Sequence, residues 1–362
     1  MRATKVAFDL SRTPITGIGL MCGTSHDALD IAIVSFLRPN THWDFNLLNS
    51  ASYQLPKELK ASLAGATEMS ALEYVQLDRN FAIFCAESID DFRSTYSGNI
   101  EFIASHGATI FHQPQNGLTT QIGSGAIISA LTGFPVVSDF RAQDVTKGGQ
   151  GAPLVPFADK MLFSNYTATL NLGGFANLSV LNQPELIGFD ISPCNKALNH
   201  IYTSSQLEGE FDLNGNLAKT GMVLKPLLDS LNSIKFYKAK PPKSLGHEWF
   251  ISDFLPIIST NNQTSDLLAT ITEHIALQIV QNLPIEGSVL ITGGGAFNSF
   301  LLERIQKLSN CTCVIPDPSI IDYKEAIEFA FLGALRIINQ LNIDKTVTGA
   351  SSNSIAGALY LP

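Results

Sequence analysis

Apolar segments with the length and composition of strands alternate along the chain with segments of helical periodicity. Residues 16–36 contain two apolar runs around a short polar turn, and residues 168–181 repeat this arrangement around a Gly-Gly turn. Between them, and again in residues 264–283, apolar positions recur every three or four residues, as in amphipathic helices. The alternation predicts an α/β protein. Because each half opens on a strand–turn–strand unit, we expect a duplicated fold whose two turns face one ligand.

Local signals indicate where individual helices begin. Ser70 followed by Glu73 forms the pattern of a capping box, and Asp322 followed by Glu325 forms a second one. A triple-glycine loop precedes Asn298, which we expect to cap the helix that follows. Three helix starts are therefore predicted from sequence alone.

Length and composition favour two domains. The chain has 362 residues, of which 45% are hydrophobic, so it can bury a large core. The Gly-rich loop 139–153 is the expected crossing between the domains. This places the domains at residues 1–145 and 146–362, with a C-terminal segment that is free to pack back on the first domain.

Charge and cysteine usage exclude several classes of protein. A formal net charge of −9 and a pI near 5.2 argue against a protein that follows nucleic-acid backbones. The sequence shows no secretory signal and no apolar run of the roughly 18 residues that a membrane span needs. The five cysteines are odd in number and have neither CxxC pairing nor zinc-like spacing. We therefore expect a cytoplasmic protein with free thiols and no nucleic-acid or membrane partner.

The polar turn Gly23-Thr24-Ser25 is the first candidate for ligand binding. Its glycine lets the backbone approach an anion, and its N–H and hydroxyl groups are donors for a phosphate. Asp27 and Asp30 follow the turn, where a carboxylate can hold Mg²⁺ directly or through water. The alternative is a hairpin whose polar side chains satisfy their own backbone.

Two further glycine-rich turns occur in the second half. Gly173-Gly174 lies between two apolar runs, and Gly293-Gly294-Gly295 joins a strand to a helix, whose N-terminus favours an anion. Neither turn has the GxGxxG or GxxxxGK[ST] spacing of the common nucleotide motifs. Reversal of the chain direction is a sufficient explanation for the glycines of each turn taken alone. The three turns together are what a nucleotide kinase of the actin and sugar-kinase architecture needs.

Asp190 follows an apolar strand and precedes a segment with helix-start signals. A carboxylate at such a point is half-buried and oriented by N–H groups, which suits a general base that deprotonates a hydroxyl or a water. An ordinary N-cap is the alternative.

Many ordered segments between residues 17 and 349 resemble one family. They are Gly19-Leu-Met-Cys-Gly-Thr-Ser25 with Asp27 and Asp30, Ser105-His-Gly107, Phe111-His-Gln-Pro114, Ser138-Asp-Phe-Arg141, Gly148-Gly-Gln-Gly-Ala-Pro-Leu-Val-Pro156, Leu170-Asn-Leu-Gly-Gly174, Gly188-Phe-Asp190, Pro241-Pro-Lys-Ser244 and Thr292-Gly-Gly-Gly-Ala296. Together they look like the segments of anhydro-N-acetylmuramic acid kinases, and their number and order exclude accidental similarity.

This resemblance implies a two-domain actin-like ATPase of the ribonuclease H-like fold, with a duplicated mixed sheet flanked by helices. It also implies a cytoplasmic homodimer that acts in peptidoglycan recycling, with ATP and Mg²⁺ as cofactors and a small anhydrosugar as substrate. Members of the family convert 1,6-anhydro-N-acetylmuramic acid, ATP and water into N-acetylmuramic acid 6-phosphate and ADP. By its position in the family pattern, Asp190 would be the base that activates water.

The resemblance also assigns binding residues. The first domain would bind phosphate and sugar, and the second would bind the nucleotide. The ATP contacts would be Gly23, Thr24, Ser25, His26, Asp27, Ala28, Leu29, Asp30, Gly173, Gly174, Gly293, Gly294 and Gly295, with Asp27 also near Mg²⁺.

For the sugar, the resemblance implies His106, Arg141 and Glu325. The guanidinium fork of Arg141 matches a lactyl carboxylate, and an interdomain ion pair is its alternative. Glu325 fits either a sugar hydroxyl or its capping box, and His106 either lines the substrate or makes an ordinary hydrogen bond.

The chain departs from the family pattern at five positions, mostly on the sugar side. Ala28, Ser192 and Cys194 replace glycines, Asn199 stands where an aspartate is common, and Gln143 where an arginine is. A positive φ at Ser192 or Cys194 would be strained. Two alternatives to the anhydro-N-acetylmuramic acid reaction therefore stay open: a kinase of a related anhydrosugar, and a nonenzymatic ATP- or sugar-binding protein on the same scaffold.

Overall fold

The chain folds into two units, each built on a mixed β-sheet. The computed structural model describes residues 14–362 apart from 24–25, 40–41, 184, 206, 242 and 259–261. Unit 1 contains the chain through Leu162 together with Tyr323–Pro362, and unit 2 is Phe163–Asp322. Within the described residues, no helix is long and apolar enough to cross a membrane.

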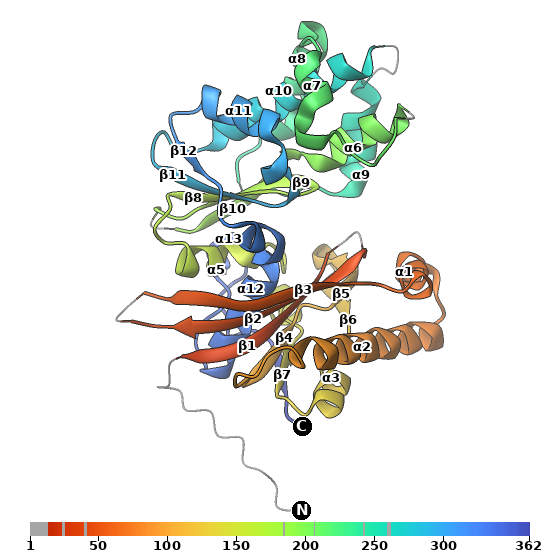
Figure 1. Ribbon diagram of the computed structural model, residues 1–362, viewed down its shortest axis with the longest axis vertical. Helices are drawn as coiled ribbons and strands as arrows, with labels where there is room; N and C mark the ends of the chain where they lie inside the picture. Colours follow the sequence, from red (N-terminus) through yellow and green to blue (C-terminus); the bar gives the residue numbers. More distant parts are fainter. Residues whose placement is uncertain are drawn as a thin grey trace, which may run out of the picture. The chain divides into compact units, whose positions relative to one another are not determined.

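The sheet of unit 1 combines an antiparallel meander with parallel strands (Figure 1). Strands β1, β2 and β3 are antiparallel neighbours, whereas β4 and β7 continue the sheet parallel to β1, and β13 closes it antiparallel to β7. The strands are β1 (Ile15–Cys22), β2 (Ala28–Leu37), β3 (Asp44–Gln54), β4 (Phe102–Ser105), β7 (Val136–Ser138) and β13 (Ala358–Tyr360); β5 (Ala108–Gln113) and β6 (Leu118–Ile122) form a separate hairpin.

The sheet of unit 2 repeats this topology. Three antiparallel strands are followed by two strands parallel to the first one, in the order β10-β9-β8-β11-β12. They are β8 (Ala168–Leu172), β9 (Phe175–Val180), β10 (Ile187–Pro193), β11 (Ser288–Thr292) and β12 (Thr312–Val314). The order corresponds strand for strand to β3-β2-β1-β4-β7 of unit 1. The expected α/β architecture with a duplicated mixed sheet, the ribonuclease H-like arrangement, is therefore confirmed.

Helices flank both sheets. Those of unit 1 are α1 (Lys57–Ala64), α2 (Ala71–Arg93), α3 (Gly125–Thr132), α4 (Ala142–Thr146), α5 (Val155–Leu162), α12 (Pro318–Ile337, which begins in unit 2) and α13 (Lys345–Thr348). Those of unit 2 are α6 (Asn195–Ser204), α7 (Asn216–Thr220), α8 (Lys225–Asn232), α9 (His247–Trp249), α10 (Thr264–Asn282) and α11 (Ser299–Leu308). Short 3₁₀ and π turns join them.

Alternation along β1 separates two packing faces. Ile18 and Leu20 belong to a core cluster with Phe81 of α2. Gly19 faces α12, where a Cβ at this position would lie 1.9 Å from the carbonyl oxygen of Ala326. The absence of a side chain at residue 19 therefore lets α12 pack directly on the sheet. In unit 2 the central helix is α10, whose apolar positions, including Leu268, Ile271 and Ile275, are fully buried.

Two of the three helix starts read from the sequence are confirmed. Ser70 accepts a hydrogen bond from the Glu73 N–H at 3.4 Å while Glu73 accepts one from the Ser70 N–H, which completes the capping box of α2. Asn298 caps α11 through the Leu301 N–H. The box at Asp322 and Glu325 is wrong, because α12 has already begun at Pro318.

The chain crosses between the units later than expected. The loop 139–153 lies within unit 1, where the buried carboxylate of Asp144 accepts hydrogen bonds from the Gly151 N–H at 2.8 Å and the Thr348 hydroxyl at 2.7 Å. These bonds tie the loop to the C-terminal segment. The units therefore divide at Leu162 and Phe163, not between 145 and 146, and Tyr323–Pro362 returns to unit 1.

Asp144→Ala is expected to lower the free energy of unfolding by about 1.5–3 kcal/mol, because it leaves two buried donors without their charged acceptor. The matched control is Asp229→Ala, which removes an exposed carboxylate whose one side-chain partner in the described part of the chain is Lys225, and it should cost less than about 1 kcal/mol. Urea unfolding measures both. Equal losses in the two variants would show that Asp144 does not anchor the loop.

Candidate functional site

Asp190 occupies the position in β10 where the strand departs from regular pairing. The register with β9 shifts between Asp190 and Ser192, and a bulge at such a point re-aims a side chain. The carboxyl is half-buried, and burial raises its pKa from 3.8 to about 6, while the hydrogen bond from the Leu245 N–H opposes the shift. Asp190 is therefore ionised at neutral pH yet basic enough to take a proton.

The described residues of the segment 239–246, which are all but 242, form a loop, here called the covering loop, that holds Asp190 from one side. The Leu245 N–H donates to Asp190 Oδ2 at 2.8 Å, and the Asp190 N–H donates to the Lys243 carbonyl oxygen at 3.1 Å. Asp190 Oδ1 makes no hydrogen bond to any described residue. One carboxylate oxygen is thus fixed by the protein and the other is available to a ligand.

The turn Gly173-Gly174 joins β8 to β9 and rests against the start of α6. The Gly174 carbonyl oxygen accepts hydrogen bonds from the N–H groups of Cys194 at 2.8 Å and Lys196 at 3.2 Å, and the Gly173 carbonyl accepts one from Asn195 at 3.1 Å. This brings the turn to the residues that immediately follow the Asp190 strand.

The three glycines of the loop after β11 differ in whether the structure has room for a side chain at each position. Gly293 has φ +78°, and a Cβ there would lie 2.3 Å from Asn171 Oδ1; a Cβ on Gly295 would lie 2.7 Å from Leu172 Cβ. Gly294 has room, with its nearest atom, Asn195 Nδ2, at 3.5 Å. Packing within the chain therefore requires glycine at residues 293 and 295, but not at residue 294.

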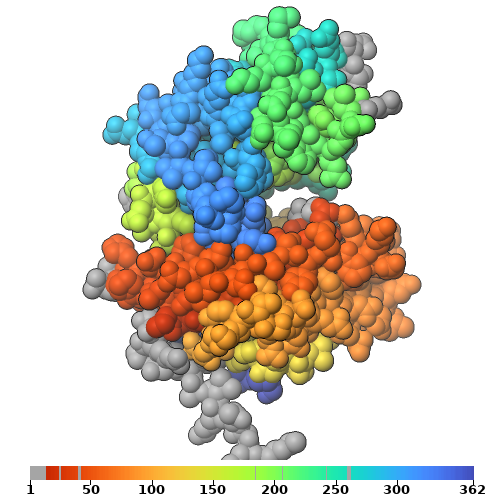
Figure 2. Space-filling view, viewed as in Figure 1, coloured from red at the N-terminus to blue at the C-terminus, as the bar shows by residue number. Residues whose placement is uncertain are grey.

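A cavity of about 540 Å³ lies in unit 2 beside these turns. Asn195, Asn199 and Gly294 line one part of it, and Phe211, Asn214 and Phe297 line another. Phe211 and Phe297 are 54% and 47% exposed, so each offers a ring face to a ligand. In Figure 2 the green segment that includes α7 and the blue segment that includes α11 lie side by side in this unit. The cavity has the size and lining of a small-molecule site.

The first turn lies in unit 1, and Thr24 and Ser25 fall outside the described residues. His26 has φ +52° and its N–H donates to the Gly23 carbonyl oxygen at 3.0 Å, which closes a tight turn. The carboxylate of Asp27 is exposed and pairs with Lys60, and Asp30 accepts a hydrogen bond from the Ser52 hydroxyl at 2.7 Å.

Ala28 and Leu29 start β2 directly after this turn. The Leu29 side chain is buried in the core cluster of unit 1, so it is directed away from solvent. Ala28 is half-buried and pairs with Gln54 of β3. Any ligand contact from Leu29 would therefore come from its backbone.

His106 and Arg141 are in direct contact within unit 1. Arg141 Nη2 and Nε lie 2.7 Å and 3.1 Å from His106 Nε2, and His106 Nδ1 lies 2.9 Å from the Gly107 carbonyl oxygen. Since the carbonyl only accepts and the guanidinium only donates, the proton of His106 is on Nδ1. Burial, aided by the Arg141 charge, lowers the pKa of His106 to about 3, so the ring is neutral.

Arg141 keeps part of its donor fork free. Its Nη1 also donates to the Gly151 carbonyl oxygen at 2.6 Å, which leaves one N–H each on Nη1 and Nη2 without a partner among the described residues. Burial lowers the pKa of Arg141 to about 10, so it stays charged at neutral pH. Glu325 on α12 is near enough to interact electrostatically with it, and burial raises the pKa of Glu325.

The departures in the loop after Asp190 do not require a left-handed backbone conformation. Ser192 and Cys194 are fully buried, and neither has a positive φ; Cys194 has φ −122°. The expected strain is absent because β10 extends through Pro193 and the Cys194 N–H bonds to the preceding turn. Of the other three departures, Ala28 starts β2 as described above, Asn199 lines the cavity of unit 2, and Gln143 is exposed on α4.

Two features near the site were missed by sequence reasoning. One is the Leu245 N–H, because a backbone donor has no side-chain signature. The other is the buried Lys324, whose Nζ lies 2.6 Å from Asp159 Oδ1 and 2.7 Å from Glu328 Oε1, next to Glu325 in the chain. The pattern of a lysine and a glutamate four residues apart signals an exposed helix face, which is the opposite of what is found.

Comparison with known proteins gives a consistent result over nearly the whole chain. A family model described as anhydro-N-acetylmuramic acid kinase matches residues 16–362. Curated relatives with that same description are 33% identical in Crocosphaera subtropica, 34% in Pseudomonas syringae and 35% in Pseudomonas fluorescens. Each alignment covers 95% of this chain and 98% of the relative.

Gly174→Ala tests whether the second turn is kept open for a ligand. A Cβ there would have its nearest atom at 3.9 Å, so we expect the thermal midpoint to be unchanged. Binding of ATP, measured by calorimetry, is expected to weaken at least about tenfold, because a methyl group would block close approach of a phosphate to the backbone.

The control for this substitution is Gly65→Ala at the end of α1, where a Cβ also has room, at 3.7 Å from the Ala61 carbonyl oxygen. It should change neither the thermal midpoint nor the binding of ATP. Undiminished ATP binding by Gly174→Ala would remove the turn from the nucleotide site.

Proposed function

This chain belongs to the anhydro-N-acetylmuramic acid kinase family, and from that membership we propose its reaction in detail. It hydrolytically opens the 1,6-anhydro ring of 1,6-anhydro-N-acetylmuramic acid and phosphorylates O6 with ATP. The products are N-acetylmuramic acid 6-phosphate and ADP, as peptidoglycan recycling requires. The observation that carries the proposal is Asp190, a half-buried carboxylate with a pKa of about 6 and one uncommitted oxygen.

Asp190 acts as the general base. Its Oδ1 takes a proton from a water whose oxygen attacks C1 of the sugar, and the bond between C1 and O6 breaks. The released O6 attacks the γ-phosphorus, ADP leaves, and the proton on Asp190 passes to solvent. The bond from the Leu245 N–H keeps the carboxylate oriented through the step.

The glycine turns and the cavity of unit 2 would bind ATP. Phe211 and Phe297 would contact the flat faces of adenine, and the backbone at Gly173-Gly174 and Gly294 would approach the phosphates. The turn of residues 23–30 would hold phosphate oxygens from unit 1. Alignment and charge neutralisation are the main contributions that a protein makes to phosphoryl transfer.

Mg²⁺ fits the carboxylate of Asp27, an exposed oxygen ligand beside the first turn, where Lys60 is one of its partners. When bound, the ion neutralises charge on the phosphate oxygens. The Lys60 ammonium would then move to a phosphate or to solvent. Asp30 is tied to Ser52 and would act on the ion through water.

The sugar would lie against unit 1. The two free N–H groups of Arg141 would bind the lactyl carboxylate, with neutral His106 holding the guanidinium in place. Glu325, whose pKa is raised by burial, would accept or donate a hydrogen bond at a sugar hydroxyl.

We also propose that the chain works as a homodimer in the cytoplasm, where its ATP is supplied. Light scattering should give twice the mass of one chain. A monomer mass at working concentration would contradict the dimer and leave the reaction unaffected.

Asp190→Asn is expected to lower kcat about 10²–10⁴-fold while ATP still binds, because it removes the base and little else. Sugar-dependent ADP release and calorimetry measure the two effects. Asp229→Asn, an exposed substitution on α8, is the control and should leave both unchanged. Turnover by Asp190→Asn comparable to wild type would refute the assignment.

The wild-type pH profile gives an independent check. Asp190 must be ionised to act, and its pKa is raised to about 6, so kcat/KM should be level above this pH and fall as pH drops through it. Below pH 6, kcat/KM should fall about tenfold per pH unit, as expected when one group titrates. A profile that stays level down to pH 4.5 would mean that no group with this pKa is required.

A further inference from the structure

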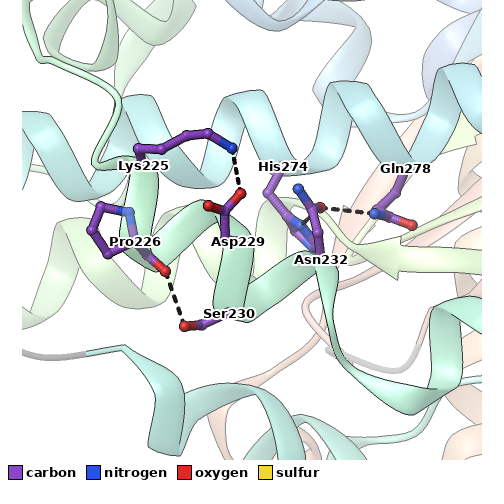
Figure 3. A network of polar contacts seen from close by, with 7 residues as sticks. All are labelled: Lys225, Pro226, Asp229, Ser230, Asn232, His274 and Gln278. Carbon is purple, nitrogen blue, oxygen red and sulfur yellow. Dashed lines mark hydrogen bonds and ion pairs between the residues drawn. The ribbon is translucent and has the colours of Figure 1, made fainter.

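A buried polar network joins three elements of unit 2 behind the covering loop. His274 on α10 lies with Nδ1 2.7 Å from Asn232 Oδ1 at the end of α8 and with Nε2 2.9 Å from the Tyr237 hydroxyl. Gln278, one turn further along α10, donates to the same Asn232 oxygen at 2.9 Å. Figure 3 shows His274 and Gln278 reaching Asn232 from one face of α10.

The chemistry of the partners fixes the proton positions. Because Asn232 Oδ1 accepts from Gln278, it also accepts from His274, so the His274 proton is on Nδ1 and Nε2 accepts from Tyr237. His274 is fully buried, and burial lowers its pKa to about 3, which keeps the ring neutral. The Tyr237 hydroxyl therefore has a permanent acceptor.

Tyr237 also anchors both ends of the covering loop. Its ring packs on His274 at a centroid distance of 5.0 Å and on Trp249, just beyond the loop, at 6.3 Å. Its neighbour Phe236 packs on the same tryptophan at 5.3 Å. The residues that enter and leave the loop are thus fixed to one point on α10.

Phe236 connects this anchor to Asp190. The Lys243 ammonium lies 4.7 Å from the Phe236 ring centroid and 3.5 Å from the Phe236 carbonyl oxygen, and 5.7 Å from the ring of Phe189. Two residues on, the Leu245 N–H makes the bond to Asp190 Oδ2. Each step from His274 through Tyr237 and Phe236 to Lys243 is a direct contact or a chain neighbour, and the Lys243 carbonyl oxygen itself accepts from the Asp190 N–H.

We propose that Tyr237, held by His274, is a positioning residue for Asp190 that keeps the covering loop where the Leu245 N–H meets the carboxylate. This inference rests on the proposed role of Asp190 as the base. Among the charged and titratable groups nearby, Lys240 and Lys243 are the cations on the covering loop. Lys196 of α6 lies over Phe175 and Phe250, and His274 is neutral. The Leu245 bond favours the ionised carboxylate, so losing this bond while the carboxyl stays buried raises the pKa of Asp190.

Tyr237→Phe removes only the hydroxyl oxygen. We expect the acidic limb of the kcat/KM profile to shift to higher pH by about half a unit. The value of kcat/KM should therefore fall about twofold at pH 6 and change little at pH 8. KM for ATP should be unchanged. Hydrogen exchange at the Leu245 amide should become faster. A merely structural role would lower the thermal midpoint without moving the limb or the exchange rate.

Tyr202→Phe is the matched control, since it removes a hydroxyl that donates to the exposed Glu208 carbonyl oxygen in the same unit. It should leave the acidic limb of the kcat/KM profile unchanged. Phe236→Leu is a second test that leaves the His274 network intact but removes the ring beneath Lys243, and it should move the limb in the same direction. This variant decides the question if Tyr237→Phe fails to fold.

The outcomes separate the two claims. An unmoved limb in the folded variants, with Asp190→Asn inactive, would overturn the positioning role alone. Full activity of Asp190→Asn would overturn the proposed base and, with it, this inference. An upward shift in Tyr237→Phe or Phe236→Leu, absent in Tyr202→Phe, would support it.

Discussion

The hydrogen bond from the Leu245 N–H to Asp190 is the interaction on which the proposed chemistry depends. Burial alone would push the carboxyl toward its neutral form, in which it cannot take a proton. The N–H donor opposes that effect and leaves the pKa at about 6, close to the working range of a base at neutral pH. The donor belongs to a loop with no regular structure, so it must be held in place by other contacts. The aromatic and polar contacts of Tyr237 meet this need.

The repeated topology of the two sheets explains why similar turns occur in both units. In each sheet the first two strands are antiparallel, and their turn is a short glycine-containing segment at Gly23 or at Gly173-Gly174. At Gly174 the fold leaves room for a side chain, so the missing Cβ has no structural cause there. Gly293 is different, since its positive φ and close contacts require glycine for packing. Glycine is therefore required by packing at Gly293, whereas at Gly174 its proposed role is to leave space for a ligand.

The sequence was sufficient for features that depend on local pattern. The capping box at Ser70, the cap at Asn298 and the duplicated sheet each follow from periodicity or short motifs. Prediction failed where a short motif occurs inside an element that has already begun, and where the deciding partner is distant in the chain. Asp322 and Glu325 imitate a helix start inside a helix that began at Pro318, and Lys324 is buried because Asp159 approaches it from another helix. The Gly-rich loop belongs to unit 1, where Asp144 accepts a hydrogen bond from Thr348, about two hundred residues away in the chain.

In the proposed function, one site performs both ring opening by water and phosphorylation of O6. The most direct measurement is NMR and mass analysis of the product formed from 1,6-anhydro-N-acetylmuramic acid and ATP in oxygen-18-labelled water. The proposed reaction gives an opened sugar with the label on the C1 hydroxyl and an unlabelled phosphate on O6. Labelled inorganic phosphate with the anhydro ring intact would contradict it.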